Sequence, residues 1–386
     1  MTTQSKFSSS ELPAPHSALR TPHSAIGCVR VLIVDDSGVV RANLTHMLAS
    51  APYIQVIGSV NSGKEALAFV GRQKPDVITM DLHMPEMDGF EATRRIMETI
   101  PVPIIIVSAI WDPAEQAMSF KALEAGAVAC LPKPPGFGHP DYERAVAELI
   151  ATVRQMAEVK VIRRWPKRAA APLAPAPVLI PVKRQIQVVA LGASTGGPPA
   201  IREFLAQLPA DFSVPILVVQ HIAGGFARGF VEWLNTSSPL PVYLAAHHET
   251  IWKGRVYVAP DDLQMGVTDG GKIVLSNALP EHYLRPSVSY LFRSVAEAYG
   301  QAAVGILLTG MGTDGSAELK LVKDAGGVTF VQDKESSIVH GMPGEAIRLG
   351  AAEYVLTPAT IATTLAEMIN RPVKCGVRSA ERGTGN

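Results

Sequence analysis

A serine stands among glycines in the segment GASTGG, residues 192–197, directly after the apolar run Val188–Leu191. A Gly-x-Ser-x-Gly turn between a strand and a helix exposes the serine hydroxyl as a nucleophile. Phosphate binding is the alternative, because glycine-rich turns of this kind present free N–H donors to anions. Pro198 and Pro199 remove two such donors, and no Gly-Lys-Ser/Thr follows. The spacing therefore favours Ser194 as a nucleophile.

A serine nucleophile needs a general base, and the base needs a carboxylate that fixes its tautomer. His221 follows the apolar run Ile216–Gln220, and Asp314 lies in the turn after the run Ala303–Leu308. If these runs are parallel strands, their carboxyl ends bring all three side chains to one edge of a sheet. Spacing alone leaves other histidines and acids open as the base and its partner: His247, His248, His282, His340, Asp211, Asp261, Asp262 and Asp333.

A second group of polar residues follows the apolar runs of the N-terminal half. Asp35, Asp36 and Asp81 stand at the ends of two runs, Ser108 ends a third, and Lys133 follows a fourth. Converging carboxylates repel one another unless a cation lies between them, and Mg²⁺ prefers such hard oxygen ligands. One such residue alone would be a solvated loop residue. Together they predict a magnesium site that accepts a phosphoryl group, with Ser108 and Lys133 on the phosphoryl oxygens.

Two series of short apolar runs must position these residues, and longer amphipathic segments separate the runs. This alternation is typical of parallel sheets covered by helices on both faces. We therefore predict the α/β class, with two doubly wound parallel-sheet domains joined by a Pro/Ala-rich linker. The segment Ile251–Ser276, with its Asp-Gly-Gly turn, predicts an antiparallel hairpin at the edge of the second sheet.

Composition sets the limits of these domains. We predict a disordered extension at 1–27, a first domain at 28–158, a linker at 159–185, a second domain at 186–370 and a frayed tail at 371–386. The 35 basic residues equal the 35 acidic ones, which argues against nucleic acid as a partner. No run approaches the ~20 apolar residues of a membrane span. The three cysteines are dispersed, so a cytoplasmic protein without membrane insertion is expected.

The N-terminal half resembles the receiver domain of two-component response regulators over residues 28–152, through VLIVDDSGVVR, MDLHMPEMDG, Ser108 and Lys133-Pro134. The resemblance implies that Asp81 is the phosphoacceptor, that a chemosensory histidine kinase is the phosphodonor, and that the His83 carbonyl completes a magnesium site. Receivers often place an aromatic switch residue three positions before the lysine. Here that position is Cys130, so the signal from Asp81 is expected to travel differently.

The C-terminal half resembles the catalytic domain of chemotaxis protein-glutamate methylesterases, through GASTGG, VVQHIAGGF, RPSVSYLF and LLTGMGTDG. The resemblance implies that Ser194, His221 and Asp314 are catalytic, with Thr195 and Met311 at the oxyanion. It implies methyl-accepting chemotaxis receptors as substrates, release of methanol, deamidation of glutamine, and no cofactor for ester hydrolysis. The receiver is expected to cover the site until Asp81 is phosphorylated. Gln264 stands where the family usually has histidine.

Two other functions remain open. One is a response regulator whose second domain binds a partner without catalysis. The other is a hydrolase of small soluble esters, although the order Ser194, His221, Asp314 departs from the Ser, Asp, His order of typical α/β-hydrolases.

Overall fold

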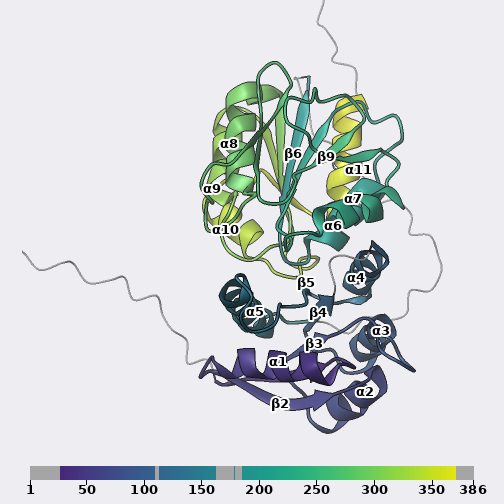
Figure 1. Cartoon of the computed structure of the whole chain (residues 1–386). Helices are drawn as coiled ribbons and strands as arrows, with labels where there is room; N and C mark the ends of the chain where they lie inside the picture. Colours follow the sequence, from purple (N-terminus) through teal and green to yellow (C-terminus); the bar gives the residue numbers. More distant parts are fainter. Residues whose placement is uncertain (1–26, 109–112, 162–177, 179–184, 371–386) are drawn as a thin grey trace, which may run out of the picture.

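The computed structural model describes residues 27–108, 113–161, 178 and 185–370. The predicted N-terminal extension except Gly27, the C-terminal tail, and residues 162–177 and 179–184 of the predicted linker lie outside these ranges. The described residues form two α/β units, each built on a parallel sheet (Figure 1). No described helix is long and apolar enough to cross a membrane.

The first unit is a five-stranded parallel sheet in the order β2-β1-β3-β4-β5. Helices α1 and α5 cover one face, and α2, α3 and α4 cover the other (Figure 1). Side chains at the starts of three helices cap free backbone N–H groups: Ser37, Ser62 and Asp88. The elements are β1 (Val29–Val34), α1 (Gly38–Ala49), β2 (Ile54–Val60), α2 (Gly63–Arg72), β3 (Val77–Met80), α3 (Gly89–Thr99), β4 (Ile104–Ser108), α4 (Pro113–Ala125), β5 (Ala129–Pro132) and α5 (Tyr142–Ala157).

The second unit is a seven-stranded parallel sheet in the order β14-β13-β12-β6-β7-β9-β8. Helices α8, α9 and α10 lie on one side and α6, α7 and α11 on the other (Figure 1). Its elements are β6 (Val188–Ala193), α6 (Gly197–Ala206), β7 (Ile216–Gln220), α7 (Ala227–Asn235), β8 (Val242–Leu244), β9 (Val256–Val258), β10 (Gln264–Val267), β11 (Ile273–Ser276), α8 (Val288–Tyr299), β12 (Ala303–Leu307), α9 (Ser316–Asp324), β13 (Val328–Gln332), α10 (Met342–Arg348), β14 (Tyr354–Leu356) and α11 (Pro358–Asn370).

The central strands are apolar because both faces of each sheet are covered. Every residue of β3, β4, β6, β7, β12 and β13 is buried. Such continuous apolar runs are what a parallel sheet with helices on both faces requires. The predicted α/β class, with two parallel-sheet domains, is confirmed.

One expectation about the second sheet is wrong. Strands β10 and β11 pair with each other as an antiparallel hairpin, but they form a separate two-stranded sheet and do not extend the edge of the main one. The hairpin packs instead against α8. The reason is burial, since Met265, Val267 and Ile273 belong to the same apolar cluster as Val288, Leu291 and Val295 of α8.

Candidate active site

Ser194 follows β6 at the start of a tight turn into α6. Its N–H donates to the Thr309 carbonyl at 3.0 Å, which ties the turn to the loop after β12. Gly196 has a left-handed backbone, with φ of 76°, and a Cβ there would lie 2.5 Å from Ile338. A Cβ on Gly310 would lie 2.8 Å from the Ser194 Cβ. Glycine at both positions lets two loops close around the serine.

His221 follows β7 and contacts Asp314, which follows β12. The distance from His221 Nε2 to Asp314 Oδ2 is 2.9 Å, and both side chains are buried, with exposures of 8% and 1%. His221 Nδ1 is also buried and has no hydrogen-bond partner among the described residues. The second ring nitrogen is therefore free to accept a proton. Strands β12, β6 and β7 are neighbours, which brings Ser194, His221 and Asp314 to one edge of the sheet.

Three further donors hold the Asp314 carboxylate at the start of α8. Oδ1 accepts from the Ser287 hydroxyl at 2.8 Å and from the Ser289 N–H at 3.1 Å, and Oδ2 accepts from the Val288 N–H at 2.7 Å. Burial alone would raise the pKa of Asp314, but the contact with His221 and the hydrogen bonds from Ser289 and Ser287 outweigh it and hold the pKa well below its usual value. The carboxylate is therefore ionised at neutral pH.

Thr195 and Met311, the predicted oxyanion residues, flank Ser194 on two different loops. Within the described part of the chain, neither backbone N–H donates a hydrogen bond. Thr309 locks the two loops together, because its hydroxyl donates to the Thr195 carbonyl at 2.9 Å and accepts from the Val339 N–H at 2.9 Å. Thr195 lines the cavity of Ser194, and the role of both N–H groups at an oxyanion stays a prediction.

The cavity that contains Ser194 lies between the two units and has a volume of about 250 Å³. The second unit contributes Ser194, Thr195, His221 and Leu284 to its wall, and β5 and α5 of the first unit contribute residues such as Cys130 and Met156. The first unit therefore covers the serine. Burial raises the pKa of the Cys130 thiol, whose Sγ lies 3.8 Å from the Ser119 carbonyl oxygen.

An aromatic cluster joins α4 of the first unit to α7 of the second. Phe120 on α4 is completely buried and stacks on Trp233 of α7, with 5.3 Å between ring centroids. The ring centroid of Phe230 lies 5.6 Å from that of Phe120. Arg202 of α6 forms an ion pair with Glu124 of α4, and its guanidinium lies 4.8 Å from the Trp233 ring centre. Nothing in the sequence patterns identified Phe120 as a contact between the units.

The phosphoryl site predicted in the first unit is also assembled. Ligand oxygens of Asp35, Asp36 and Asp81 all lie within 4.8 Å of one another. Lys133 Nζ lies 2.9 Å from Asp81 Oδ2 and 3.2 Å from Asp35 Oδ2, and Ser108 ends β4 as a buried residue. Burial and the Asp35 charge raise the pKa of Asp81, although Lys133 opposes this rise.

Asp35 Oδ2 and Asp81 Oδ2 are buried and accept no hydrogen bond among the described residues apart from their ion pairs with Lys133. Oxygen atoms in that state, beside the exposed Asp36 carboxylate, fit a hard divalent cation. The His83 side chain is exposed, which agrees with a role for its carbonyl alone.

Several of the other candidates for base and orienting acid have partners elsewhere. His247 and His248 lie with their ring centres 3.7 Å apart, and His247 accepts the Leu275 N–H of the hairpin. His340 approaches Gly310 through its backbone, but its Nδ1 pairs with Ser337 at 3.3 Å. Asp261 binds the Gly225 N–H. Among the described histidines, His221 is the one in contact with Asp314.

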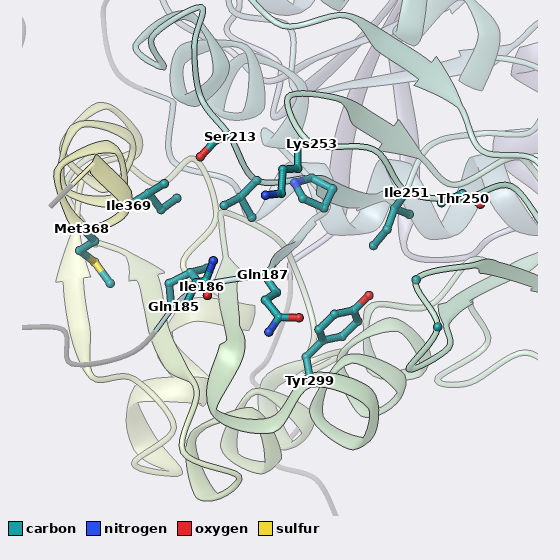
Figure 2. Close-up of a pocket in the computed structure, with 14 residues that line it drawn as sticks. Gln185, Ile186, Gln187, Ser213, Thr250, Ile251, Lys253, Tyr299, Met368 and Ile369 are labelled. Atoms are coloured by element: carbon teal, nitrogen blue, oxygen red, sulfur yellow. The ribbon is translucent and has the colours of Figure 1, made fainter. Parts of the chain in front are cut away.

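A second cavity lies at the opposite edge of the seven-stranded sheet (Figure 2). Its volume is about 410 Å³, and its walls include Gln187, Lys253, Tyr299 and Ile369. It shares no lining residue with the cavity of Ser194, so the larger space is not where the predicted chemistry is found.

Two family models match the chain. Residues 189–365 match the CheB methylesterase model, and residues 31–139 match the response regulator receiver domain.

Among curated relatives, a protein-glutamate methylesterase/protein-glutamine glutaminase of Geobacter metallireducens is 54% identical over 344 residues, which cover 88% of this chain and 99% of the relative. A protein of the same name from Nitrosospira multiformis is 52% identical, with 88% and 97% covered. Among solved structures, the catalytic domain of Thermotoga maritima CheB methylesterase is 36% identical with a TM-score of 0.46, covering 48% of this chain and 100% of that domain.

Proposed function

The chain belongs to the CheB methylesterase family, and from this premise we propose that Ser194, His221 and Asp314 hydrolyse glutamate methyl esters on methyl-accepting chemotaxis receptors. The protein is a protein-glutamate methylesterase/protein-glutamine glutaminase with a receiver domain. The observation that carries the assignment of residues is the buried contact between Asp314 and His221, which lines the same cavity as Ser194.

The reaction proceeds by acyl transfer. His221 Nδ1 takes the hydroxyl proton as Ser194 Oγ attacks the ester carbonyl, and ionised Asp314 stabilises the imidazolium. The Thr195 and Met311 N–H groups hold the oxyanion. Each such donor contributes about 10²–10³-fold in comparable enzymes. Methanol leaves with the proton from His221, and water, activated by the same base, releases the glutamate. A glutamine side chain follows the same route and releases ammonia.

Receiver chemistry controls access to the serine. We propose that Asp81 accepts a phosphoryl group from a chemosensory histidine kinase, with Ser108 and Lys133 on its oxygens. Asp35, Asp36 and Asp81 would hold Mg²⁺, which supplies charge neutralisation there. The first unit walls the cavity of Ser194, so phosphorylation acts by favouring an arrangement in which the cavity is open.

The domain limits and location belong to the same proposal. A receiver at 28–158 is joined by a linker at 159–185 to a catalytic domain at 186–370. The dispersed cysteines fit a cytoplasmic location.

The experiment is methanol release from membranes that contain methylated receptors, with and without a small phosphodonor. The wild type is expected to release methanol faster with the donor. Ser194→Ala should release none while remaining folded, because no other group replaces the nucleophile. Asp81→Asn should retain basal release and lose the stimulation. Release by folded Ser194→Ala contradicts the assignment, and no release by the wild type favours a regulator without catalysis.

Hydrolysis of a simple ester separates the third possibility. If the wild type hydrolyses a simple ester and leaves the receptor methylated, the protein is a hydrolase of small esters.

A further inference from the structure

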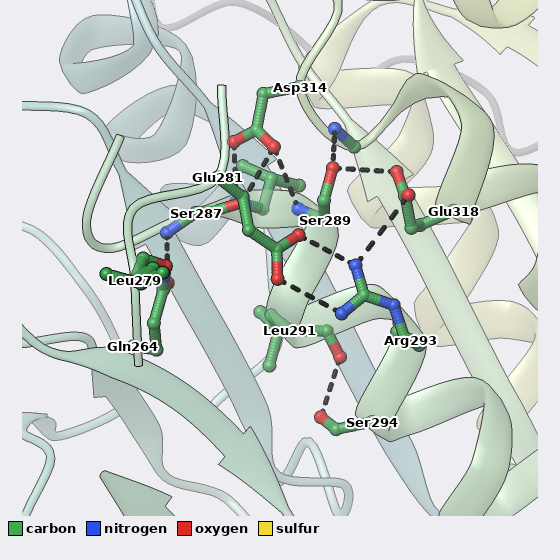
Figure 3. Close-up of polar contacts among 12 residues, drawn as sticks. Gln264, Leu279, Glu281, Ser287, Ser289, Leu291, Arg293, Ser294, Asp314 and Glu318 are labelled. Carbon is green, nitrogen blue, oxygen red and sulfur yellow. Dashed lines mark hydrogen bonds and ion pairs between the residues drawn. The ribbon is translucent and has the colours of Figure 1, made fainter. Parts of the chain in front are cut away.

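Gln264, the first residue of β10, is completely buried and uses its whole side-chain amide on backbone groups (Figure 3). Oε1 accepts the Ser287 N–H at 2.8 Å. Nε2 donates to the carbonyls of Leu279 and Leu284 at 3.2 and 3.4 Å. One amide therefore fastens three points of the segment 279–287, and a side chain that only donates or only accepts could not do so.

Ser287 is the point where this segment meets the catalytic carboxylate. Its N–H binds Gln264, and its hydroxyl donates to Asp314 Oδ1 at 2.8 Å. The next two residues donate their N–H groups to the same carboxylate at the start of α8. Ser287 is therefore one of three residues in a row whose hydrogen bonds orient the Asp314 carboxylate, which presents Oδ2 to His221.

The middle of the segment contributes Leu284 to the cavity wall. Glu281 and Leu284 exchange two backbone hydrogen bonds, at 3.1 and 2.8 Å. The two residues between them, His282 and Tyr283, have left-handed backbones with φ of 51° and 65°. Leu284 lines the cavity together with Ser194 and His221. Gln264 thus joins a wall of the cavity to the residue that holds Asp314.

A separate set of contacts supports the segment from outside (Figure 3). Arg293 on α8 binds both carboxylate oxygens of Glu281, at 3.1 and 2.7 Å. Ser289 donates its hydroxyl to Glu318 at 2.7 Å and accepts the Gly315 N–H, directly after Asp314, at 2.8 Å. These contacts hold the turn and α8 but do not replace the link through Gln264 to Ser287.

We propose that Gln264 and Ser287 are a positioning pair for ester hydrolysis, which makes the 279–287 wall and the Asp314 carboxylate one rigid body. The inference rests on the proposed function of Ser194, His221 and Asp314. Neither residue of the pair touches the ester. They act through Asp314, so loosening either should slow the chemical step and leave substrate binding largely unchanged.

The test uses the full-length chain with phosphodonor and methylated receptor membranes. We compare the wild type with Gln264→Met, which keeps the side-chain length but neither accepts from Ser287 nor donates to the two carbonyls. Active enzyme is counted by the endpoint of labelling with a fluorophosphonate. We expect kcat per active site to fall at least about tenfold and KM to stay within about twofold. A role limited to folding would lower the number of active sites without lowering kcat per site.

Ser294→Ala is the matched control. The Ser294 hydroxyl accepts the Val267 N–H of β10 at 3.2 Å and donates to the Leu291 carbonyl at 2.8 Å, so it joins the same strand to the same helix without touching Asp314. This variant should lower the unfolding temperature and keep kcat per active site. Gln264→His, which retains one donor and one acceptor, should recover part of the kcat lost in Gln264→Met.

If Gln264→Met does not fold, Ser287→Ala gives the same test, because it removes only the hydroxyl link to Asp314. If the wild type is active and the folded variants have the same kcat per site, the positioning pair is refuted and the esterase assignment stands. Absence of esterase activity in the wild type refutes both.

Discussion

The Asp314 carboxylate accepts hydrogen bonds from three donors besides His221. The carboxylate accepts from His221, from the Ser287 hydroxyl and from two backbone N–H groups. This arrangement places one oxygen against His221 Nε2, and Nδ1 has no hydrogen-bond partner among the described residues. In the proposed mechanism this carboxylate orients the base, and four hydrogen bonds restrict its rotation.

Asp314→Asn is expected to lower kcat by roughly 10³–10⁴-fold, because an amide NH₂ opposite His221 favours the wrong tautomer. Steady-state methanol release with phosphodonor measures this loss. A folded variant with kcat near that of the wild type would show that another acid orients the base.

The same substitution should change how stability depends on pH. The folded-state pKa of Asp314 is depressed, so the carboxylate contributes stability above its unfolded pKa of about 3.9 and loses it as pH falls toward the lower folded value. The wild type should therefore exceed Asp314→Asn in free energy of unfolding most clearly near pH 7, and the gap should narrow below about pH 4. Urea unfolding at several pH values measures the gap, and a constant gap contradicts the depressed pKa.

At the scale of elements, neighbouring strands determine which residues meet. Strands β12, β6 and β7 lie side by side and end in the turns of Asp314, Ser194 and His221. The turn between β6 and α6 is tight, since Gly196 has φ of 76° and no room for a Cβ beside Ile338. That turn holds Ser194, the predicted nucleophile, and α6 begins immediately after it.

Gly196→Ala should therefore lower both stability and kcat, because the added methyl group clashes with Ile338 and strains a left-handed residue. We expect a loss of about 1–3 kcal/mol in the free energy of unfolding. Gly270→Ala is the control, since a Cβ there meets nothing closer than 3.7 Å. Equal unfolding temperatures and equal kcat values for the two variants would show that the turn tolerates a side chain.

At the scale of the whole molecule, Phe120 of the receiver packs into an aromatic cluster of the catalytic domain. Phe120 is buried among Trp233, Phe230 and Phe226 of the catalytic domain. Cys130, at the position where receivers often carry an aromatic switch, has its Sγ 3.8 Å from the carbonyl of Ser119, the residue before Phe120. Cys130, three positions before Lys133, therefore contacts the helix whose Phe120 packs on the catalytic domain.

Phe120→Ala should raise methanol release in the absence of phosphodonor. Truncating a buried phenylalanine costs about 3–5 kcal/mol of stability. Each ~1.4 kcal/mol by which the closed arrangement loses stability relative to the open one lowers the closed-to-open ratio tenfold. Basal release should rise by about tenfold or more. Phe137→Ala, at a receiver residue that is 87% exposed, should leave basal release unchanged. Unchanged release in Phe120→Ala would contradict closure through this contact.

The sequence alone determined the features that depend on local chemistry. Continuous apolar runs identified the strands, because a parallel strand covered on both faces needs apolar residues throughout. The residues after those runs identified Ser194, His221, Asp314 and the cluster around Asp81, because strand ends at one edge converge. The fold class is confirmed, whereas the roles of the site residues and the domain limits stay predictions.

The tertiary structure alone decided contacts that depend on distant segments. Ser287 and Gln264 are 27 and 50 positions before Asp314. No sequence periodicity predicts that Ser287 binds Asp314 or that Gln264 binds Ser287. Phe120 is an ordinary apolar residue of a helix until α7 packs against it. The hairpin β10–β11 is separate from the main sheet because its apolar residues pack against the apolar face of α8. Pattern predicts an element, but packing partners are chosen by shape and burial across the whole chain.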